Sequence, residues 1–289
     1  MEFTAVGWNL FHGRDFPPDR ALFTWRSRLL RIEGRNQTHV QVNRDLTAEF
    51  AAMLAGAEWD VALLQECPPR FAAPLAAACG AEAHRVLTSR NSFAALRTVA
   101  ARLNPDLIAS GEGGSNLTLV RNSLRCALSG HKPQKAHRSG GIVERRELAI
   151  HVGRPERRAM AFTRIAVGDD AQLCVANLHA TNDRPELATA DVLQAAEAAD
   201  GWAGDSPLLF GGDLNLRPGE DPGVFEELER RFGLGGATGP GAIDHLLSRG
   251  LDVVSPVAPW AAEQRELRSE GRALRLSDHA PIQASFASA

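Results

Sequence analysis

The chain has 289 residues, of which 44% are hydrophobic and 23% charged, and its formal net charge at pH 7 is −3. These values are typical of a folded globular protein and exclude intrinsic disorder, a fibrous repeat and a disulfide-stapled miniprotein. No apolar run reaches the roughly 18 residues that a membrane-spanning helix needs. The first residues contain no signal-peptide pattern, so we expect a protein without a membrane segment that works in the cytoplasm.

Secondary structure is predicted along the whole chain, in an irregular order. A strand at 3–9 precedes helices at 19–33 and 46–57, a buried strand at 60–66, and alanine-rich helices at 70–79 and 92–103. Strands follow at 115–122, 141–152, 157–167 and 171–179, and the turns between them indicate antiparallel pairing. A helix at 183–202 is followed by a strand at 207–215, a helix at 222–232, and strands at 242–248, 251–257 and 280–286. This order fits neither a barrel nor a doubly wound sheet. We therefore expect one domain over 1–289, with two sheets packed face to face and helices outside.

Several of these strands end in a polar or ionisable residue. Each of these residues stands at or just beyond the end of an apolar run: Asn9, Glu66, His179, Asp213, Asn215, Asp244 and, just before the last strand, Asp278 and His279. Side chains at strand ends converge on one rim of a sheet, where loops form a cleft. We therefore expect these residues to form one site.

The residue types indicate the chemistry of this site. The carboxylates of Glu66, Asp213, Asp244 and Asp278 are hard oxygen ligands, which favour Mg²⁺ or Mn²⁺ over structural zinc. A histidine beside an aspartate makes a general base. No glycine fingerprint for a dinucleotide and no phosphate-binding loop motif is present. A hard cation, a His–Asp base and neutral amide donors together fit the attack of water on a phosphorus ester.

The motifs around these residues resemble those of the endonuclease/exonuclease/phosphatase superfamily, which includes deoxyribonuclease I. They are GWN at 7–9, LLQE at 63–66, ANLHAT at 176–181, FGGDLN at 210–215, IDHLL at 243–247 and LSDHAP at 276–281. The resemblance implies an α/β fold of the deoxyribonuclease I type. This fold is a four-layered α/β-sandwich of two packed mixed β-sheets flanked by helices.

The resemblance also implies a role for each site residue. Glu66 would hold the divalent cation, Mg²⁺ or Mn²⁺, with help from Asn9 and Asp278. His279 would be the general base and Asp244 its orienting carboxylate, while Asp213 would position the attacking water or help to deprotonate it.

The same resemblance implies a phosphate-binding set. Asn215 and His179 would contact phosphate oxygens, and His179 would protonate the leaving group. Arg146, in ERREL, would also bind phosphate, with Arg145 as the alternative because a one-residue slip exchanges the two faces of a strand. The remaining histidines are interpreted as structural, although His12 lies close enough to Asn9 to be tested.

The distribution of charge along the chain indicates which kind of substrate the protein binds. The window 121–164 contains eleven arginine or lysine residues against three glutamates, which favours phosphate-rich partners. The leading hypothesis is thus a nuclease with nucleic acid as substrate. One alternative is a phosphoesterase for a phospholipid headgroup or a small phosphorylated metabolite, and another is a catalytically silent binding module.

The absence of tyrosine counts against a standard abasic-site repair enzyme. Residues 12–45 read as an insertion, either a lid or a helix packed outside.

Overall fold

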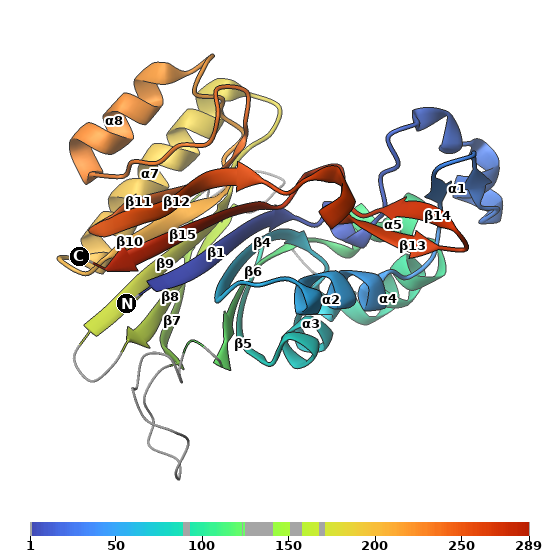
Figure 1. Cartoon of the computed structure of the whole chain (residues 1–289), viewed down its shortest axis with the longest axis horizontal. Helices are drawn as coiled ribbons and strands as arrows, with labels where there is room; N and C mark the ends of the chain where they lie inside the picture. The colour runs from blue at the N-terminus through green and yellow to red at the C-terminus, as the bar shows by residue number, and fades with distance from the viewer. Residues whose placement is uncertain are drawn as a thin grey trace, which may run out of the picture.

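Two β-sheets form the centre of the computed structural model, which describes residues 2–88, 93–122, 124, 141–150, 158–167 and 171–288. The strands of the first sheet are β1 (Glu2–Asn9), β4 (Val61–Cys67), β5 (Ala81–Leu87), β6 (Ser115–Arg121), β12 (Leu251–Pro259) and β15 (Ile282–Ser288). Those of the second are β7 (Gly141–Ala149), β8 (Ala159–Val167), β9 (Ala171–His179), β10 (Leu208–Asp213) and β11 (Asp244–Arg249). The two sheets lie against each other between helices, which confirms the predicted α/β architecture (Figure 1).

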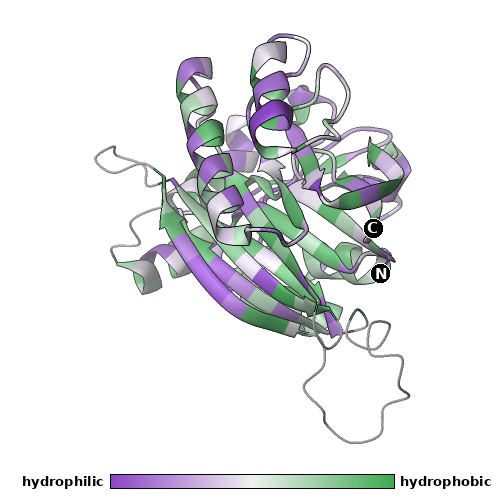
Figure 2. Ribbon diagram, turned by 90° about the vertical axis from the view of Figure 1, so that its left-hand side faces the viewer, coloured by the Kyte–Doolittle hydropathy of each residue, from purple (hydrophilic) through white to green (hydrophobic). Residues whose placement is uncertain are grey.

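Strand direction brings particular strand ends together. The first sheet has the order β12–β15–β1–β4–β6–β5 and the second β11–β10–β9–β8–β7. β1 pairs with β4 in parallel, and β9 pairs with β10 in parallel, whereas the other neighbours are antiparallel. The carboxyl ends of β1 and β4 therefore lie side by side, as do those of β9 and β10. The chain ends lie close together because β1 pairs with β15, as Figure 2 shows.

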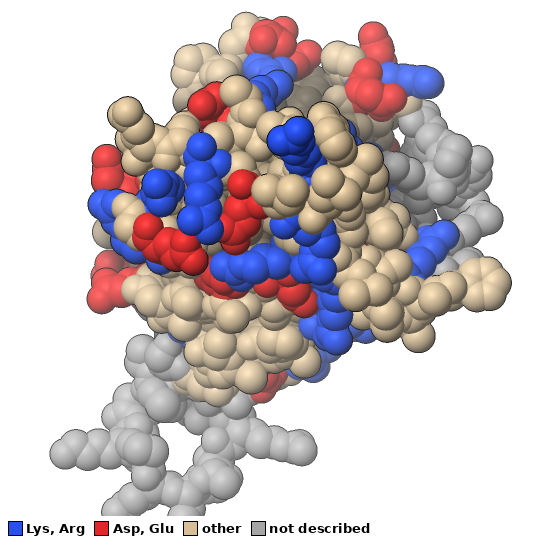
Figure 3. All heavy atoms as spheres, turned by 90° about the vertical axis from the view of Figure 1, so that its right-hand side faces the viewer, with Lys and Arg blue, Asp and Glu red and all other residues tan. Residues whose placement is uncertain are grey.

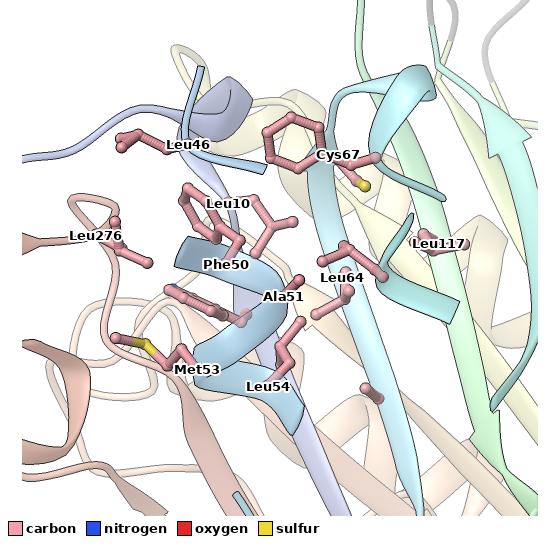
Figure 4. Close-up of a cluster of buried hydrophobic side chains, with 14 of the residues drawn as sticks. Leu10, Leu46, Phe50, Ala51, Met53, Leu54, Leu64, Cys67, Leu117 and Leu276 are labelled. Atoms are coloured by element: carbon pink, nitrogen blue, oxygen red, sulfur yellow. The ribbon is translucent and has the colours of Figure 1, made fainter. Parts of the chain in front are cut away.

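Apolar side chains fill three layers. Between the sheets lie residues such as Phe3, Val61, Leu209 and Phe286. Helices α2 (Thr47–Gly56) and α3 (Ala72–Cys79) cover the outer face of the first sheet, where Phe50, Leu54, Leu64 and Leu117 pack together (Figure 4). Helices α7 (Pro185–Ala203) and α8 (Pro222–Phe232) cover the second sheet. Ala188, Val192, Ala195 and Ala199 form the buried stripe of α7, at the spacing of one helical face.

Residues 12–45 differ from the helix predicted at 19–33. Only α1 (Trp25–Leu30) is α-helical there, because Thr24 caps its start and Arg31 ends it in a left-handed conformation. Short elements fill the rest: η1 (Phe11–Gly13), η2 (Arg20–Leu22), β2 (Gly34–Arg35) and β3 (Val40–Gln41). The segment lies against the hairpin of β13 (Glu266–Ser269) and β14 (Arg272–Arg275), since the N–H of Ala273 donates to the carbonyl of Thr38 at 2.8 Å.

Further elements complete the described chain. The sequence analysis expected α4 (Ala94–Leu103) but missed β5 and α5 (Pro105–Glu112). Two single turns, η3 (Pro69–Phe71) and η4 (Ala262–Arg265), stand in connections. Among the described helices, none combines the length and the apolar character needed to cross a bilayer.

A network of buried amides cross-links the two sheets. The amide of Gln65 in β4 donates to the side-chain oxygen of Asn177 in β9 at 2.7 Å, and Asn177 donates to the carbonyl of Leu117 in β6 at 3.2 Å. Asn116 in β6 donates to the carbonyl of Ala159 in β8 at 2.8 Å. Buried polar groups need such partners, so the network fixes how the sheets face each other. Glu66 follows Gln65 directly, and the network thereby fixes its position relative to β9.

Candidate active site

The polar residues at the strand ends meet at one rim of the two sheets. Asn9 and Glu66 come from the carboxyl ends of β1 and β4, and His179 and Asp213 from those of β9 and β10. Asp244 opens β11, while Asp278 and His279 lie in the loop between β14 and β15. All the carboxylates, histidines and amides predicted for the site are thus gathered in one cluster.

A His–Asp pair forms one side of the cluster. The ring Nδ1 of His279 lies 2.7 Å from Oδ2 of Asp244, and its Nε2 lies 3.8 Å from Oδ2 of Asp213. The backbone around His279 is anchored from both sides, because Trp8 donates to its carbonyl at 3.1 Å and its own N–H donates to Ser277 at 3.1 Å. Burial alone would lower the pKa of His279, but Asp244 and then Asp213 raise it to about 10. This geometry is that of an oriented general base.

Asp213 occupies the middle of the cluster. Its Oδ2 accepts from the amide of Asn9 at 2.9 Å, and its Oδ1 accepts from the backbone N–H of Asn215 at 3.2 Å. Burial and the charge of Asp244 raise its pKa to about 7. The amide of Asn215 donates to the carbonyl of Ala180 at 3.2 Å, which uses one of its two N–H groups. Asp213 is therefore placed to hold a water molecule beside His279.

Two glycines that precede Asp213 allow it to occupy the middle of the cluster. A Cβ on Gly211 would overlap the carbonyl oxygen of His245, and a Cβ on Gly212 would overlap that of Leu178. Gly212 also has a φ of +125°, which side-chain-bearing residues rarely adopt. The two glycines of FGGD thus let β9 and β11 approach β10 closely on both sides.

We expect Gly212→Ala to lower the free energy of unfolding by about 3 kcal/mol, because overlap and backbone strain add. Chemical denaturation measures this loss. Gly201→Ala is the matched control: Gly201 lies within α7 with nothing within 4 Å of the added Cβ. That substitution should raise stability by about 0.5–1 kcal/mol. Equal stability of Gly212→Ala and wild type would contradict the close-approach explanation.

Glu66 lies opposite the His–Asp pair, between two imidazoles. Its Oε2 is 3.2 Å from Nε2 of His12, and its Oε1 is 3.8 Å from Nε2 of His179. Burial alone would raise the pKa of Glu66, but His12, His179 and the Asn9 amide outweigh it and leave the pKa below its usual value. Glu66 is therefore an anion at neutral pH and a suitable cation ligand. His12, predicted to be structural but close enough to Asn9 to be tested, lies in the cluster.

His179 is buried and neutral. Burial lowers its pKa to about 3. Arg158, itself 8% exposed, has its NH1 3.5 Å from Nδ1 of His179. An arginine can only donate, so Nδ1 accepts and the ring proton resides on Nε2, which faces the cluster. His179 is thus placed to donate its Nε2–H to a phosphoryl oxygen, and its role as the acid for a leaving group stays a prediction.

Arg146 lies away from this cluster, contrary to the prediction. It stands in mid-β7 opposite Phe162, is mostly exposed and pairs with Glu144. The alternative, Arg145, pairs with Glu82 of β5 at 3.2 Å. Arg158, just before β8, instead lies beside the site, next to His179. Strand alternation alone did not identify it, because the decisive contact comes from a connection between strands.

The donor set fits a divalent cation. Burial and then the neighbouring Glu66 raise the pKa of Asp278, just as burial and then Asp244 raise that of Asp213. Crowded carboxylates of this kind are stabilised by a bound cation. Asp213, Asp244 and His279 also form a group whose ligand atoms lie within 4.8 Å of one another. In that group, however, Nδ1 of His279 is already hydrogen-bonded to Asp244. Glu66, which lies outside the group, is ionised and is therefore the cation ligand that we favour. Asn9 donates an amide N–H to Asp213 and accepts the N–H of Phe11 at its oxygen, which keeps a second lone pair, so its part in cation binding stays a prediction.

The basic window 121–164 does not form a free basic face within the described part of the chain. Arg164 pairs with Glu144 at 2.8 Å, and Arg121 donates to the carbonyl of Leu54 at 2.9 Å. Residues 125–140 and 151–157 of this window lie outside the described residues. On the face that Figure 3 shows, arginine side chains are interspersed with Asp and Glu.

Comparison with known proteins identifies the family. The family model described as "Endonuclease/Exonuclease/phosphatase family" matches residues 6–279. The chain belongs to this family. A search of curated proteins by sequence found no match.

Solved structures of this family share the fold. A Bacteroides thetaiotaomicron endonuclease/exonuclease/phosphatase family protein is 13% identical, with a TM-score of 0.62, covering 100% of this chain and 98% of that chain. The mannosyl-6-phosphatase of the same organism is 13% identical, with a TM-score of 0.60, covering 98% and 99%. The human Nocturnin catalytic domain with bound sulfate is 13% identical, with a TM-score of 0.60, covering 99% and 94%. The family acts on phosphoesters, so the chain is a phosphoesterase of this superfamily.

Proposed function

We propose that the protein is a divalent-metal-dependent phosphodiesterase whose substrate is a nucleic acid. The observation that supports it most is the 2.7 Å contact of His279 with Asp244, with the other ring nitrogen of His279 turned toward Asp213. An oriented base beside a buried carboxylate suits the activation of water. Glu66, on the other side of the same cluster, suits a cation that would bind the phosphate.

Each residue of the cluster has a distinct task in this proposal. Asp244 accepts the Nδ1–H of His279 and stabilises the imidazolium that forms when Nε2 takes a proton from water. Asp213 orients that water, and the second N–H of the Asn215 amide donates to a phosphoryl oxygen. Glu66 would hold the cation, with Asp278 nearby, and a bound cation would polarise the phosphoryl group and neutralise developing charge.

The charge of the cluster favours a diester over a monoester. Glu66, Asp213, Asp244 and Asp278 provide four carboxylates, whereas three arginines of the described chain lie near them: Arg158, Arg14 and Arg265. A phosphodiester carries one negative charge and a monoester between about 1.5 and 2. The less charged substrate is repelled less by these carboxylates. Nucleic acid is the diester polymer that we place first.

A substrate panel tests this proposal. Plasmid, single-stranded DNA, RNA, a small chromogenic diester and a sugar phosphate are each incubated with Mg²⁺, Mn²⁺ or EDTA. We expect cleavage of a nucleic acid that EDTA abolishes and that salt weakens steeply. Cleavage of the small diester alone would reject the nucleic-acid substrate. No hydrolysis of any ester would reject catalysis and favour the silent binding module.

The Asp244→Asn variant should shift the pH dependence of kcat. His279 must be neutral to accept a proton, so activity rises with pH across the acid limb of the profile. The substitution removes the largest influence that raises the pKa of His279. The acid limb should therefore move to lower pH while the maximal rate falls. An acid limb that stays in place would show that Asp244 does not tune the base.

Arg158→Ala should raise KM by about ten- to one-hundred-fold, because a charged hydrogen-bond donor beside His179 is lost. Arg146→Ala is the matched control, since Arg146 pairs with Glu144 in mid-strand. Its KM should stay within about twofold of wild type. Steady-state kinetics on the substrate identified by the panel measures both. The opposite ranking would restore Arg146 to the site.

An exposed apolar surface favours a second candidate, a phospholipid diester. Seven large apolar side chains of two neighbouring helical segments are between 53% and 70% exposed: Trp25, Leu29, Leu30, Ile32, Leu96, Val99 and Leu103. Asn104, between α4 and α5, donates to the carbonyl of Arg28 at 2.8 Å and joins the two segments. Among the ion pairs of the described residues none involves Arg26, Arg28 or Arg31, although burial, the larger effect, raises the pKa of Asp106 and the charge of Arg28 lowers it. Apolar and cationic side chains of this kind suit an anionic lipid surface.

Sedimentation with vesicles tests the second candidate. Binding to phosphatidylserine-containing vesicles, lost in the double variant Trp25→Ala/Leu29→Ala, together with cleavage of a phospholipid headgroup, would favour the lipid diester. No binding to such vesicles would reject it.

A further inference from the structure

His12 contacts Glu66 but takes no part in the reaction steps described above. Nε2 of His12 lies 3.2 Å from Oε2 of Glu66, and both side chains are 18% exposed. The other oxygen of Glu66 faces His179 at 3.8 Å. The carboxylate expected to hold the cation is therefore flanked by an imidazole at each oxygen.

The backbone that carries His12 is strained. Phe11, His12 and Gly13 have φ values of 49°, 53° and 75°, three successive residues in the left-handed region. Glu66 is itself left-handed, with a φ of 45°. Side-chain-bearing residues adopt this region at a cost, and such strain gathers at functional sites. Gly13 is required here, because an added Cβ would lie 2.6 Å from the ring of Phe71. The connection after β1 is thus held in a costly shape that keeps His12 against Glu66.

A simple stabilising ion pair does not need this strain. His39 and Glu266 form a closely similar pair elsewhere: their atoms are 3.1 Å apart and their side chains are 16% and 17% exposed. Neither residue is left-handed. In addition, Glu266 is bonded to Arg275, as expected of a structural carboxylate. The strain at His12 therefore points to a purpose other than stability.

We propose that His12 is a nitrogen ligand of the same divalent cation as Glu66, and that it makes the site prefer Mn²⁺ to Mg²⁺. The proposal rests on the cation site of the proposed function. Neighbouring ligands in an octahedron with bonds of about 2.1 Å are about 3 Å apart, close to the observed separation of the two atoms. Imidazole nitrogen is a poor ligand for Mg²⁺ and a good one for transition metals. A mixed nitrogen and oxygen set thus changes selectivity without adding charge.

Calorimetric titration with Mn²⁺ and Mg²⁺ tests the preference in the full-length protein. We expect wild type to bind Mn²⁺ at least about tenfold more tightly than Mg²⁺, as imidazole ligation implies. His12→Ala should lose most of its Mn²⁺ affinity and little of its Mg²⁺ affinity. His12→Gln, which keeps a polar side chain of similar length, should behave in the same way and covers the case in which the alanine variant is unstable. His39→Ala is the matched control and should leave both affinities unchanged.

Pulsed electron paramagnetic resonance of the Mn²⁺-loaded protein identifies the ligand directly. Wild type should show coupling to ¹⁴N, and His12→Ala and His12→Gln should show it weakened or lost. An unchanged Mn²⁺ to Mg²⁺ preference, or full ¹⁴N coupling in both variants, would overturn the proposal. These outcomes can be told apart from a failure of the proposed function. If the protein hydrolyses the substrate but the His12 variants bind both cations like wild type, only the role of His12 as a ligand is rejected. If nitrogen-bound Mn²⁺ is found without any hydrolysis, only the proposed function is rejected.

Discussion

Replacing His279 with alanine is expected to lower kcat by two or more orders of magnitude, because the oriented imidazole that takes the proton from water is removed. The ring is bonded to Asp244 at 2.7 Å, and Asp244 has no comparable imidazole to orient once His279 is removed. His179 cannot substitute, since burial lowers its pKa to about 3 and Arg158 faces its Nδ1. Single-turnover kinetics on the substrate of the panel measures the loss.

The fold of His279→Ala should remain intact, because the two hydrogen bonds that anchor this residue use its backbone. Trp8 donates to the carbonyl and Ser277 accepts from the N–H, and neither bond needs the imidazole. Thermal unfolding followed by circular dichroism checks this expectation. His39→Ala, which removes a histidine with a carboxylate partner far along the chain, should retain wild-type kcat. A wild-type rate in His279→Ala would remove this residue from the mechanism.

Glu66→Gln is expected to lower kcat by two or more orders of magnitude at limiting Mn²⁺ and to weaken cation binding. The substitution keeps the size of the side chain and removes the negative charge that hard cations need. Activity should recover in part at high Mn²⁺, because Asp213 and Asp278 still attract the ion. Titration of activity and of binding against Mn²⁺ measures both effects.

The control for Glu66→Gln is Glu266→Gln. Glu266 also faces a histidine, His39, but lies in β13 outside the cluster. It should leave kcat and Mn²⁺ binding unchanged. Unaltered Mn²⁺ affinity in Glu66→Gln would place the cation elsewhere, with the group of Asp213, Asp244 and His279 as the next candidate.

The site could be predicted from the sequence where its residues end strands. Asn9, Glu66, His179 and Asp213 each close an apolar run, and parallel pairing of β1 with β4 and of β9 with β10 brings their carboxyl ends together. The two-sheet architecture followed from the mixture of βα units and antiparallel strands. These features are local in sequence or depend on strand direction alone.

Other features depend on tertiary contacts that no local pattern reveals. The contact of Arg158 with His179 joins the connection before β8 to the end of β9, and the strained turn at His12 shows only in backbone dihedrals. Strand β5 was missed because apolar and polar residues do not alternate cleanly in AEAHRVL. His84 of this strand is buried where it contacts Thr163 of the other sheet at 2.8 Å, a contact between residues far apart in the sequence. The helix predicted at 19–33 is shortened to α1, since its apolar residues lie on a largely exposed segment rather than facing a core.

Anomalous diffraction from crystals grown with Mn²⁺ and phosphate locates both the cation and the phosphate. We expect one strong manganese peak within bonding distance of the Glu66 carboxylate, and a phosphate between that ion and Nε2 of His279. Manganese bound only beyond reach of Glu66, or a phosphate that contacts neither His179 nor His279, would rule out the proposed site.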